Sequence, residues 1–138
     1  MFIILFCQKI QRNSEKNCRK PKIMTDKIVV LSTCASAEEA QRLARALVEK
    51  RLAACVTVMP GVRSVYRWRD AAGNDAIEEE EEVLLAIKTS RALLEELNNE
   101  IERLHSYEVP EVIALQIVDG SERYLAWMNR ELAHKPSL

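Results

Sequence analysis

The densest group of titratable side chains lies in one short stretch, residues 104–111, with the sequence LHSYEVPE. It contains His105, Tyr107, Glu108 and Glu111, and His105 is one of only two histidines in the chain. An imidazole close to a phenol and carboxylates suits a metal ligand or a general base. A structural role is the alternative, because a cationic histidine in the last turn of a helix is favoured by the helix dipole. The residue types by themselves leave both interpretations open.

Sulfur ligands extend the possible metal chemistry. Cys34 ends one apolar segment, and Cys55 alternates with Thr57 and Met59 in another. Soft sulfur from these residues suits a copper ion, with His105 as a nitrogen ligand. No local spacing brings them together, and a buried cysteine is more often a small hydrophobic residue. We therefore treat His105, Cys55 and Cys34 as candidate metal ligands with a structural alternative.

A second candidate group contains Tyr66, Trp68 and Lys88. Tyr66 and Trp68 lie on one face of a predicted hairpin, and Lys88 ends an apolar strand. An unpaired ammonium is costly to bury, so the structural interpretation is a lysine whose head reaches water from the strand end. The functional interpretation is a charge that faces Glu108 or Glu111.

The elements that must position these residues follow a simple order of strand, helix, strand, strand, helix, strand, helix. Apolar periodicity and turn signals predict them at 27–34, 36–51, 53–68 with a break at Pro60–Gly61, 78–89, 90–105, 111–118 and 121–132. This order is the split βαβ pattern of an α+β domain. Two βαβ units form one antiparallel sheet with the helices on one face.

Local signals support these elements. Ser36 and Glu39 form the S-x-x-E pattern of a capping box, and Ser90 is expected to cap the second helix. The hairpin carries arginines on one arm and the glutamate run 78–82 on the other. Cross-strand pairing of opposite charges is favoured here over an acidic metal trap.

The predicted strands are apolar on both faces. In the strand 27–34, for example, Val30 and Leu31 point to opposite sides, and the strands 78–89 and 111–118 alternate in the same way. A face that met water would be polar. The third helix spans about three turns and is too short to cover a four-stranded sheet. We therefore expect an obligate homo-oligomer that buries the second face.

Length and composition exclude several classes of protein. The chain has 138 residues, enough for one domain, which we place at 26–133. Its 20 basic residues are balanced by 21 acidic ones, so nothing predicts a nucleic-acid partner. The four cysteines show no C-x-x-C spacing, which favours a reduced, cytoplasmic environment over a disulfide framework.

The two ends are expected to lie outside the domain. The apolar run at the N-terminus is too short to span a bilayer, so no membrane association is predicted. No basic segment precedes this run and no small-residue cleavage site follows it, unlike a secretory signal. Residues 1–25 are therefore interpreted as a disordered extension or an overlong start before Met24, and residues 134–138 as a short tail.

Four blocks of the sequence together resemble a known family. The blocks RLAACVTVMPGVRSVYRW, EVLLAIKT, LHSYEVPEVIAL and YLAWMNREL occur in this order and resemble the CutA family of divalent-cation-tolerance proteins over about residues 26–133. The resemblance implies a ferredoxin-like subunit assembled as a homotrimer, similar in architecture to PII signalling proteins. It also implies a link to copper and other divalent metals.

The resemblance assigns characteristic positions of that family to residues of this chain, several of them at the subunit boundary. These positions are Cys55, Tyr66, Trp68, Lys88, His105, Tyr107, Pro110 and Glu111. The sequence departs from the family pattern at Ser106, where the family usually has proline, which predicts a looser backbone after His105. The hairpin tip at 69–82 is longer than expected for the family. Cys7 and Cys18 precede the matched region and are not counted as metal ligands.

Three functions follow from these observations. The leading hypothesis is a non-enzymatic, trimeric protein that binds copper or another divalent metal ion and takes part in the response to metal ions. The alternative is a PII-like regulatory module that binds a small anionic ligand between subunits through Lys88 and hairpin arginines. The third is an acid–base enzyme that uses His105, Tyr107 and Glu111 on an unknown substrate.

Overall fold

The fold described here is that of a computed structural model, which describes residues 25–134. The interpretations of residues 1–24 and 135–138, including Cys7 and Cys18, lie outside the described residues. Within residues 25–134, no helix is both long enough and apolar enough to cross a membrane.

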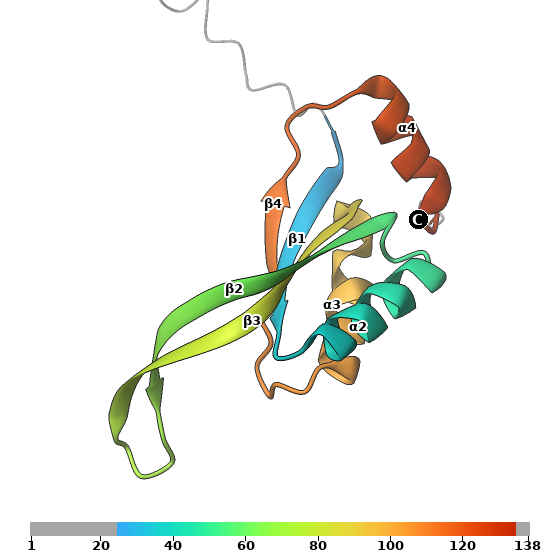
Figure 1. Cartoon of the computed structure of the whole chain (residues 1–138). Coiled ribbons are helices and arrows are strands. Elements are labelled where there is room, and N and C mark those ends of the chain that lie inside the picture. The colour runs from blue at the N-terminus through green and yellow to red at the C-terminus, as the bar shows by residue number, and fades with distance from the viewer. Residues whose placement is uncertain (1–24, 135–138) are drawn as a thin grey trace, which may run out of the picture.

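The described elements follow the predicted order. They are β1 (Lys27–Cys34), α2 (Ala37–Glu49), β2 (Cys55–Arg69), β3 (Asp75–Ser90), a 3₁₀ turn (Arg91–Leu93), α3 (Leu94–Leu104), β4 (Ile113–Gln116) and α4 (Glu122–Glu131). The strands form one sheet in the order β2-β3-β1-β4, and every neighbouring pair is antiparallel. The predicted α+β, ferredoxin-like split βαβ fold is confirmed. In Figure 1, α2 and α3 lie on one face of this sheet, and the β2–β3 hairpin projects beyond it.

The core lies between the helices and one face of the sheet. Alternate residues of β1 (Ile28, Val30 and Cys34) are fully buried there, and β3 contributes Leu85 and Ile87. The helices and the chain end complete the core with Leu43, Leu47, Leu97, Ile101, Met128 and Leu132. Because strand side chains alternate between faces, the residues between these positions point to the opposite side of the sheet.

That opposite side, which we call the open face, is not covered by any described helix. It presents Val29 and Leu31 of β1 opposite Leu115 and Ile113 of β4. Leu115 is 49 % exposed and Ile113 is 47 % exposed, although both are large and apolar. The predicted apolarity of both strand faces is therefore present in the structure. A patch of this kind on a single subunit is typical of an interaction surface.

Several element boundaries differ from the sequence predictions. β2 is one continuous strand, because Pro60 and Gly61 produce only a shift of register between Met59 and Val62. Gly61 has a φ of +75°, which glycine adopts without steric cost and which suits a bulge. The prediction that Ser90 caps the second helix is wrong. Ser90 ends β3, makes no capping hydrogen bond and precedes the 3₁₀ turn.

The capping box at α2 forms only in part. The Ser36 side chain accepts a hydrogen bond from the Glu39 backbone N–H at 3.2 Å, as predicted. The Glu39 carboxylate does not return to Ser36, however. It turns toward the loop after α3 and binds Ser106. A side chain that the local pattern assigned to a helix end therefore connects two distant segments.

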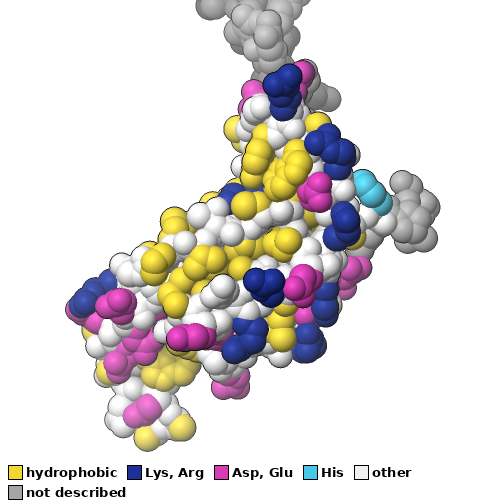
Figure 2. Space-filling model, turned by 45° about the vertical axis from the view of Figure 1, so that its right-hand side comes forward, with side chains coloured by type: hydrophobic (Ala, Val, Ile, Leu, Met, Phe, Trp, Pro, Cys, Tyr) yellow, Lys and Arg dark blue, Asp and Glu magenta, His cyan; other side chains and the backbone are white. Residues whose placement is uncertain are grey.

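Opposite charges stabilise the hairpin, with partners that differ in part from those predicted. Arg63 lies 3.5 Å from Glu79, as expected for an arginine facing the glutamate run. Arg69 instead forms an ion pair with Asp75 at 2.7 Å, beside the turn. In Figure 2, acidic side chains gather on the projecting hairpin. Most of its glutamates are therefore not neutralised by the arginines of the other arm.

Candidate metal and ligand site

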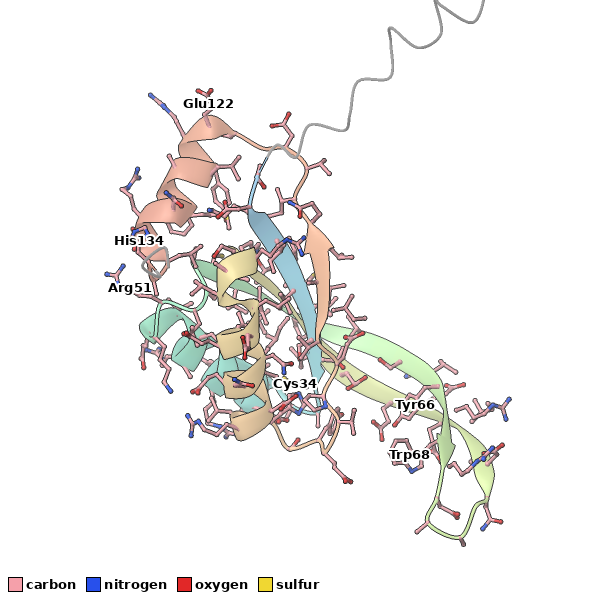
Figure 3. The ribbon with its side chains drawn as sticks, turned by 180° about the vertical axis from the view of Figure 1, so that it is seen from behind. Cys34, Arg51, Tyr66, Trp68, Glu122 and His134 are labelled. Carbon is pink, nitrogen blue, oxygen red and sulfur yellow. The ribbon has the colours of Figure 1, made fainter. Side chains whose placement is uncertain are left out.

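A groove of about 800 Å³ lies between the hairpin and the loop that joins α3 to β4. Four of the predicted site residues line it: Tyr66, Trp68, Tyr107 and Glu111. Figure 3 shows Tyr66 and Trp68 projecting from the same part of the hairpin. The chain thus brings together two segments that are about forty residues apart in the sequence. We call this hollow the hairpin groove.

Tyr107 ties the loop to the hairpin at the inner end of this groove. Its hydroxyl donates to Glu82 Oε2 at 2.9 Å, and Glu82 is only 5 % exposed. Burial, followed by the hydrogen bond and the negative charge of Glu82, raises the pKa of Tyr107. The phenol therefore stays protonated and donates its hydrogen to the carboxylate. Nothing in the sequence singled out Glu82 from the other glutamates of the run 78–82.

Tyr66 makes a related contact on the hairpin itself. Burial, with a hydrogen bond to Glu80 and the nearby charges of Glu78 and Glu82, raises the pKa of Tyr66. Glu78, Glu80 and Glu82 occupy alternate positions of β3 and so share one face of the strand. The groove is accordingly lined by tyrosine hydroxyls that point to carboxylates.

His105 lies just beyond α3, with its backbone extended (φ −75°, ψ 145°), and its side chain is completely buried. Its Nε2 lies 2.8 Å from the Thr33 carbonyl oxygen, and its Nδ1 lies 3.0 Å from the Tyr107 backbone nitrogen. The carbonyl can only accept and the backbone N–H can only donate. Hydrogen must therefore be on Nε2, and Nδ1 carries a lone pair. This arrangement is a neutral imidazole that orders the loop, rather than the cationic helix end considered above.

Glu39 holds the other side of this loop. Its Oε1 accepts from the Ser106 backbone N–H at 2.6 Å, and its Oε2 accepts from the Ser106 hydroxyl at 3.0 Å. Burial by itself would raise the pKa of Glu39. The hydrogen bonds from the Ser106 backbone and side chain act in the opposite direction, and the pKa lies below its ordinary value. The looser backbone expected at Ser106 stays a prediction; in the structure Ser106 supplies two donors to Glu39, where a proline would supply none.

Cys34 lies close to His105, as a shared metal site would require. Its Sγ is 3.7 Å from His105 Nε2, and its side chain is fully buried. Burial, with the negative charges of Glu39 and Glu82, raises the pKa of the Cys34 thiol to about 12. The group is therefore a thiol at neutral pH. It becomes a ligand only if a metal ion displaces its proton.

Cys55 and Lys88 lie elsewhere. Cys34 is opposite Val83 on β3, whereas Cys55 is opposite Lys88. Positions 83 and 88 have opposite parity along the strand, so the two cysteines point to different faces of the sheet. Within one subunit the structure does not bring Cys55 to His105. No cluster of three or more histidine, cysteine or acidic side chains placed to hold a metal occurs in residues 25–134.

The predicted contact of Lys88 with Glu108 or Glu111 is wrong within the subunit. The Lys88 ammonium instead donates to the Thr57 hydroxyl and lies 3.8 Å from Cys55 Sγ. Both partners belong to β2 and precede the bulge, whereas Glu108 and Glu111 line the groove beyond it. The sequence alone does not predict which side chains Lys88 meets. The hairpin is long, so the two ends of β3 lie beside different segments of the chain.

Replacing Tyr107 by phenylalanine tests the tie between loop and hairpin. The change removes the hydroxyl that donates to the nearly buried Glu82, and we expect it to lower the free energy of unfolding by about 1–2 kcal/mol. Tyr124→Phe is the matched control, because Tyr124 is 44 % exposed and its hydroxyl lies near Cys55, with no buried carboxylate as its partner. Urea denaturation measures both. Equal losses in the two variants would contradict the role assigned to Tyr107.

Comparison with known proteins agrees with this architecture. The family model described as "CutA1 divalent ion tolerance protein" matches residues 28–131. The "Divalent-cation tolerance protein CutA" of Thermus thermophilus is 44% identical over 100 residues, 72% of this chain and 92% of that protein. The chloroplastic protein CutA of Arabidopsis thaliana is 45% identical over 101 residues, 73% of this chain and 53% of that protein.

Solved structures show the same fold. The divalent cation tolerance protein Cut A1 from Thermus thermophilus matches with a TM-score of 0.72 and 41% identity, over 78% of this chain and 99% of that one. CutA1 from Oryza sativa matches with a TM-score of 0.75 and 37% identity, over 83% of this chain and all of that one. With its sheet order, its helices and nearly all of its described residues matched, the chain belongs to the CutA1 family of divalent ion tolerance proteins.

Proposed function

We propose that this protein is a homotrimer that binds copper or another divalent metal ion and takes part in the response to metal ions. The observation that carries the proposal is its membership of the CutA1 family, whose Thermus thermophilus member is named a divalent-cation tolerance protein. Sulfur and imidazole are the donors that copper favours, and Cys34 and His105 lie 3.7 Å apart.

Assembly supports a role for Cys55 as well. Cys55 and Thr57 point to the open face, where a neighbouring subunit of a homotrimer would pack. The half-exposed apolar side chains of that face, Ile113 and Leu115, support such packing. In this proposal Cys34 and His105 bind metal inside the subunit, and Cys55 contributes a second site at the boundary between subunits.

Metal binding at the buried pair requires two local changes. The His105 Nε2–H must leave the Thr33 carbonyl, and the Cys34 thiol must lose its proton. The Cys34 thiol releases its proton, whereas the neutral imidazole releases none, because its hydrogen moves from Nε2 to Nδ1. Copper affinity is therefore expected to increase with pH through the thiol. The same hydrogen bonds argue against the acid–base enzyme. The His105 side chain is fully buried and both of its ring nitrogens are engaged.

Charge argues against the alternative of an anionic ligand. Five glutamates line the hairpin groove, whereas Arg67 is the one basic residue among its lining residues. Lys88, which that alternative needed, lies beside Thr57 and Cys55. A small anion would therefore meet net negative charge in this groove. We also propose a cytoplasmic location, because Cys34 and Cys55 are both free thiols.

Copper titration tests the metal sites. In a Cys7→Ser, Cys18→Ser background under reducing conditions, we expect Cys34→Ala, Cys55→Ala and His105→Ala each to weaken copper binding at least about tenfold. Isothermal titration calorimetry measures the affinities, and circular dichroism verifies that each variant is folded. His134→Ala is the matched control, because His134 is exposed and lies at the far end of the molecule from the groove (Figure 3). Unchanged affinity in all three variants would exclude these ligands.

A further inference from the structure

The two hydrogen bonds of the His105 ring together fix one tautomer. The Thr33 carbonyl accepts the hydrogen of Nε2 at 2.8 Å, and the Tyr107 backbone N–H donates to the lone pair of Nδ1 at 3.0 Å. A neutral imidazole has a single N–H, so neither partner can be kept if that hydrogen changes position. Cys34 lies beside the loop that follows α3 (Figure 3), and its Sγ is 3.7 Å from the same Nε2.

A metal ion at Nε2 is compatible only with the other tautomer. Metal binding uses the lone pair of the ring nitrogen, so the hydrogen of the neutral ring must then be on Nδ1. There it would face the Tyr107 backbone N–H across 3.0 Å, and two donors cannot form a hydrogen bond with each other. The Tyr107 amide must therefore turn away from the ring. Each tautomer of His105 corresponds to a different arrangement of residues 105–107.

An acceptor for the relocated hydrogen is already in place. Glu39 Oε1 lies 3.5 Å from His105 Nδ1, and the two side chains are only 6 % and 0 % exposed. Glu39 accepts from the Ser106 N–H and hydroxyl, and a carboxylate with about four acceptor positions can take a further donor. Histidines that bind metals usually donate their second N–H to a carboxylate, which fixes the ring. Glu39 thus supports the tautomer that a metal-bound site needs.

The displaced residue, Tyr107, is linked to the hairpin. Its ring centroid lies 4.9 Å from that of His105, and its hydroxyl donates to Glu82 of β3 at 2.9 Å. Glu82 is opposite Val62, directly after the bulge of β2. A shift of the Tyr107 backbone therefore acts on a hydrogen bond to the hairpin. All of these contacts lie within one subunit, so they are present whatever covers the sheet in an assembly.

We propose that His105 is a tautomer switch that couples metal binding to the contact between Tyr107 and the hairpin. In the metal-free protein the hydrogen is on Nε2, and Nδ1 accepts from Tyr107. In the metal-bound protein Nε2 and the Cys34 sulfur hold the ion, the thiol proton passes to water, and Nδ1–H donates to Glu39. Tyr107 leaves the ring, and its hydrogen bond to Glu82 is weakened. The inference rests on the proposed copper site, in which Glu39 acts as a positioning residue.

Nuclear magnetic resonance of the whole protein with isotope-labelled histidine tests the switch. Copper(I) is the probe, because it is diamagnetic, and a His134→Ala background leaves His105 as the only one of the two histidines. We expect the ring-nitrogen shifts of His105 to report hydrogen on Nε2 without metal and on Nδ1 with copper(I). Hydrogen exchange of the Tyr107 amide should become at least about tenfold faster on loading, because the amide loses its acceptor. Exchange of the Leu47 amide in α2 should stay unchanged.

A variant at Glu39 tests the positioning of the ring. Glu39→Gln keeps an acceptor for Ser106 but removes the charge, and we expect it to weaken copper(I) binding at least about tenfold. Glu100→Gln is the matched control, because Glu100 is likewise buried but pairs with Lys50 and Arg103. Competition with a copper(I) chelator measures the affinities, and circular dichroism verifies that both variants are folded.

A variant at Tyr107 tests the connection to the hairpin. Tyr107→Phe keeps the backbone N–H but frees the loop from Glu82, so the loop moves at a lower cost. Because coupling between two sites is reciprocal, we expect this variant to bind copper(I) about fivefold more tightly, although it is less stable. Tyr124→Phe is expected to leave the affinity unchanged. A purely structural role of Tyr107 predicts no gain in affinity.

The outcomes separate this inference from the proposed function. Unchanged copper(I) binding in both Cys34→Ala and His105→Ala would remove the proposed site, and the switch with it. If those variants lose binding but His105 keeps its hydrogen on Nε2 in the loaded protein, the site stands and the switch is wrong. A Tyr107 amide whose exchange does not change on loading, or a Tyr107→Phe protein with no gain in affinity, would show that the loop does not respond to the metal.

Discussion

Replacing Leu115 by glutamate is expected to convert the proposed homotrimer into single folded subunits. Sedimentation equilibrium at micromolar concentration should give the mass of one chain, 15.8 kDa, for the variant and three times that mass for the unchanged protein. This is one of the two largest effects that we predict. It follows from the apolar open face of the sheet.

The expected dissociation has a direct physical cause. Leu115 lies opposite Val29 in the sheet and is 49 % exposed in the single subunit. Glutamate at this position can therefore remain hydrated in the subunit. In an assembly that buries the open face, the same carboxylate would lose its water without gaining a cation, which costs several kcal/mol at each copy of the contact.

A matched control separates dissociation from general destabilisation. Val48 on α2 is 43 % exposed on the helix side of the sheet, so Val48→Glu adds the same charge at similar exposure. We expect that variant to keep the mass of the unchanged protein. Leu115→Lys tests whether the sign of the charge matters. A Leu115→Glu protein that kept the trimeric mass would contradict the assignment of the open face, and a monomeric unchanged protein would contradict the homotrimer itself.

The second large effect concerns Glu39. Glu39→Ala is expected to lower the free energy of unfolding by about 3 kcal/mol, because it leaves the Ser106 N–H and hydroxyl without their acceptor. The loss also frees the loop that carries His105 and Tyr107. Urea denaturation measures the change in stability, and hydrogen exchange of the Ser106 and Tyr107 amides measures the change in the loop.

Variants at the same contact separate charge from hydrogen bonding. Glu39→Gln keeps an acceptor for Ser106 and is expected to lose less stability than Glu39→Ala. Ser106→Ala removes the hydroxyl donor and keeps the backbone donor, so its cost should be about 1 kcal/mol. Equal stability of Glu39→Ala and the unchanged protein would show that the contact does not hold the loop.

The pH dependence of this contact has a definite sign. The pKa of Glu39 in the folded protein lies below its ordinary value of 4.5. Its stabilising contribution is therefore fully present above that value and is lost as pH falls through the folded pKa. Glu39→Gln should show a smaller loss of stability on acidification. The loss that remains includes Glu100, whose pKa is lowered to about 2 by hydrogen bonds from Arg103 and Lys50.

The sequence determined the elements and their order, because apolar periodicity reflects which face of each element is buried. The alternation in β1 and β3 and the helical stripe of Leu43 and Leu47 were sufficient to predict the split βαβ fold. The predicted boundaries of the elements were less accurate at positions where the local backbone conformation determines where a strand or helix ends. Gly61 absorbs a predicted strand break as a bulge, and Ser90 belongs to a strand instead of capping a helix.

The sequence likewise identified the candidate residues by their chemical type, but it predicted only some of their neighbours correctly. Tyr66, Trp68, Tyr107 and Glu111 were selected from the sequence, and they line one groove. Lys88 was expected near Glu108 or Glu111 and lies beside Thr57 instead. The hydrophobic pattern of a strand predicts the face on which each residue lies. It does not predict which residues of other segments lie beside that residue along a long hairpin.

Only the tertiary structure decided which side chains meet. Glu39 carries a local capping signal, yet its carboxylate binds Ser106, which is sixty-seven positions away. Glu82 is indistinguishable in sequence from its neighbours, yet it alone accepts the Tyr107 hydroxyl and is nearly buried. The reason is physical. Periodicity records the average environment of a face, whereas a hydrogen bond or a ligand site depends on a few atoms from distant segments that come together only when the chain folds.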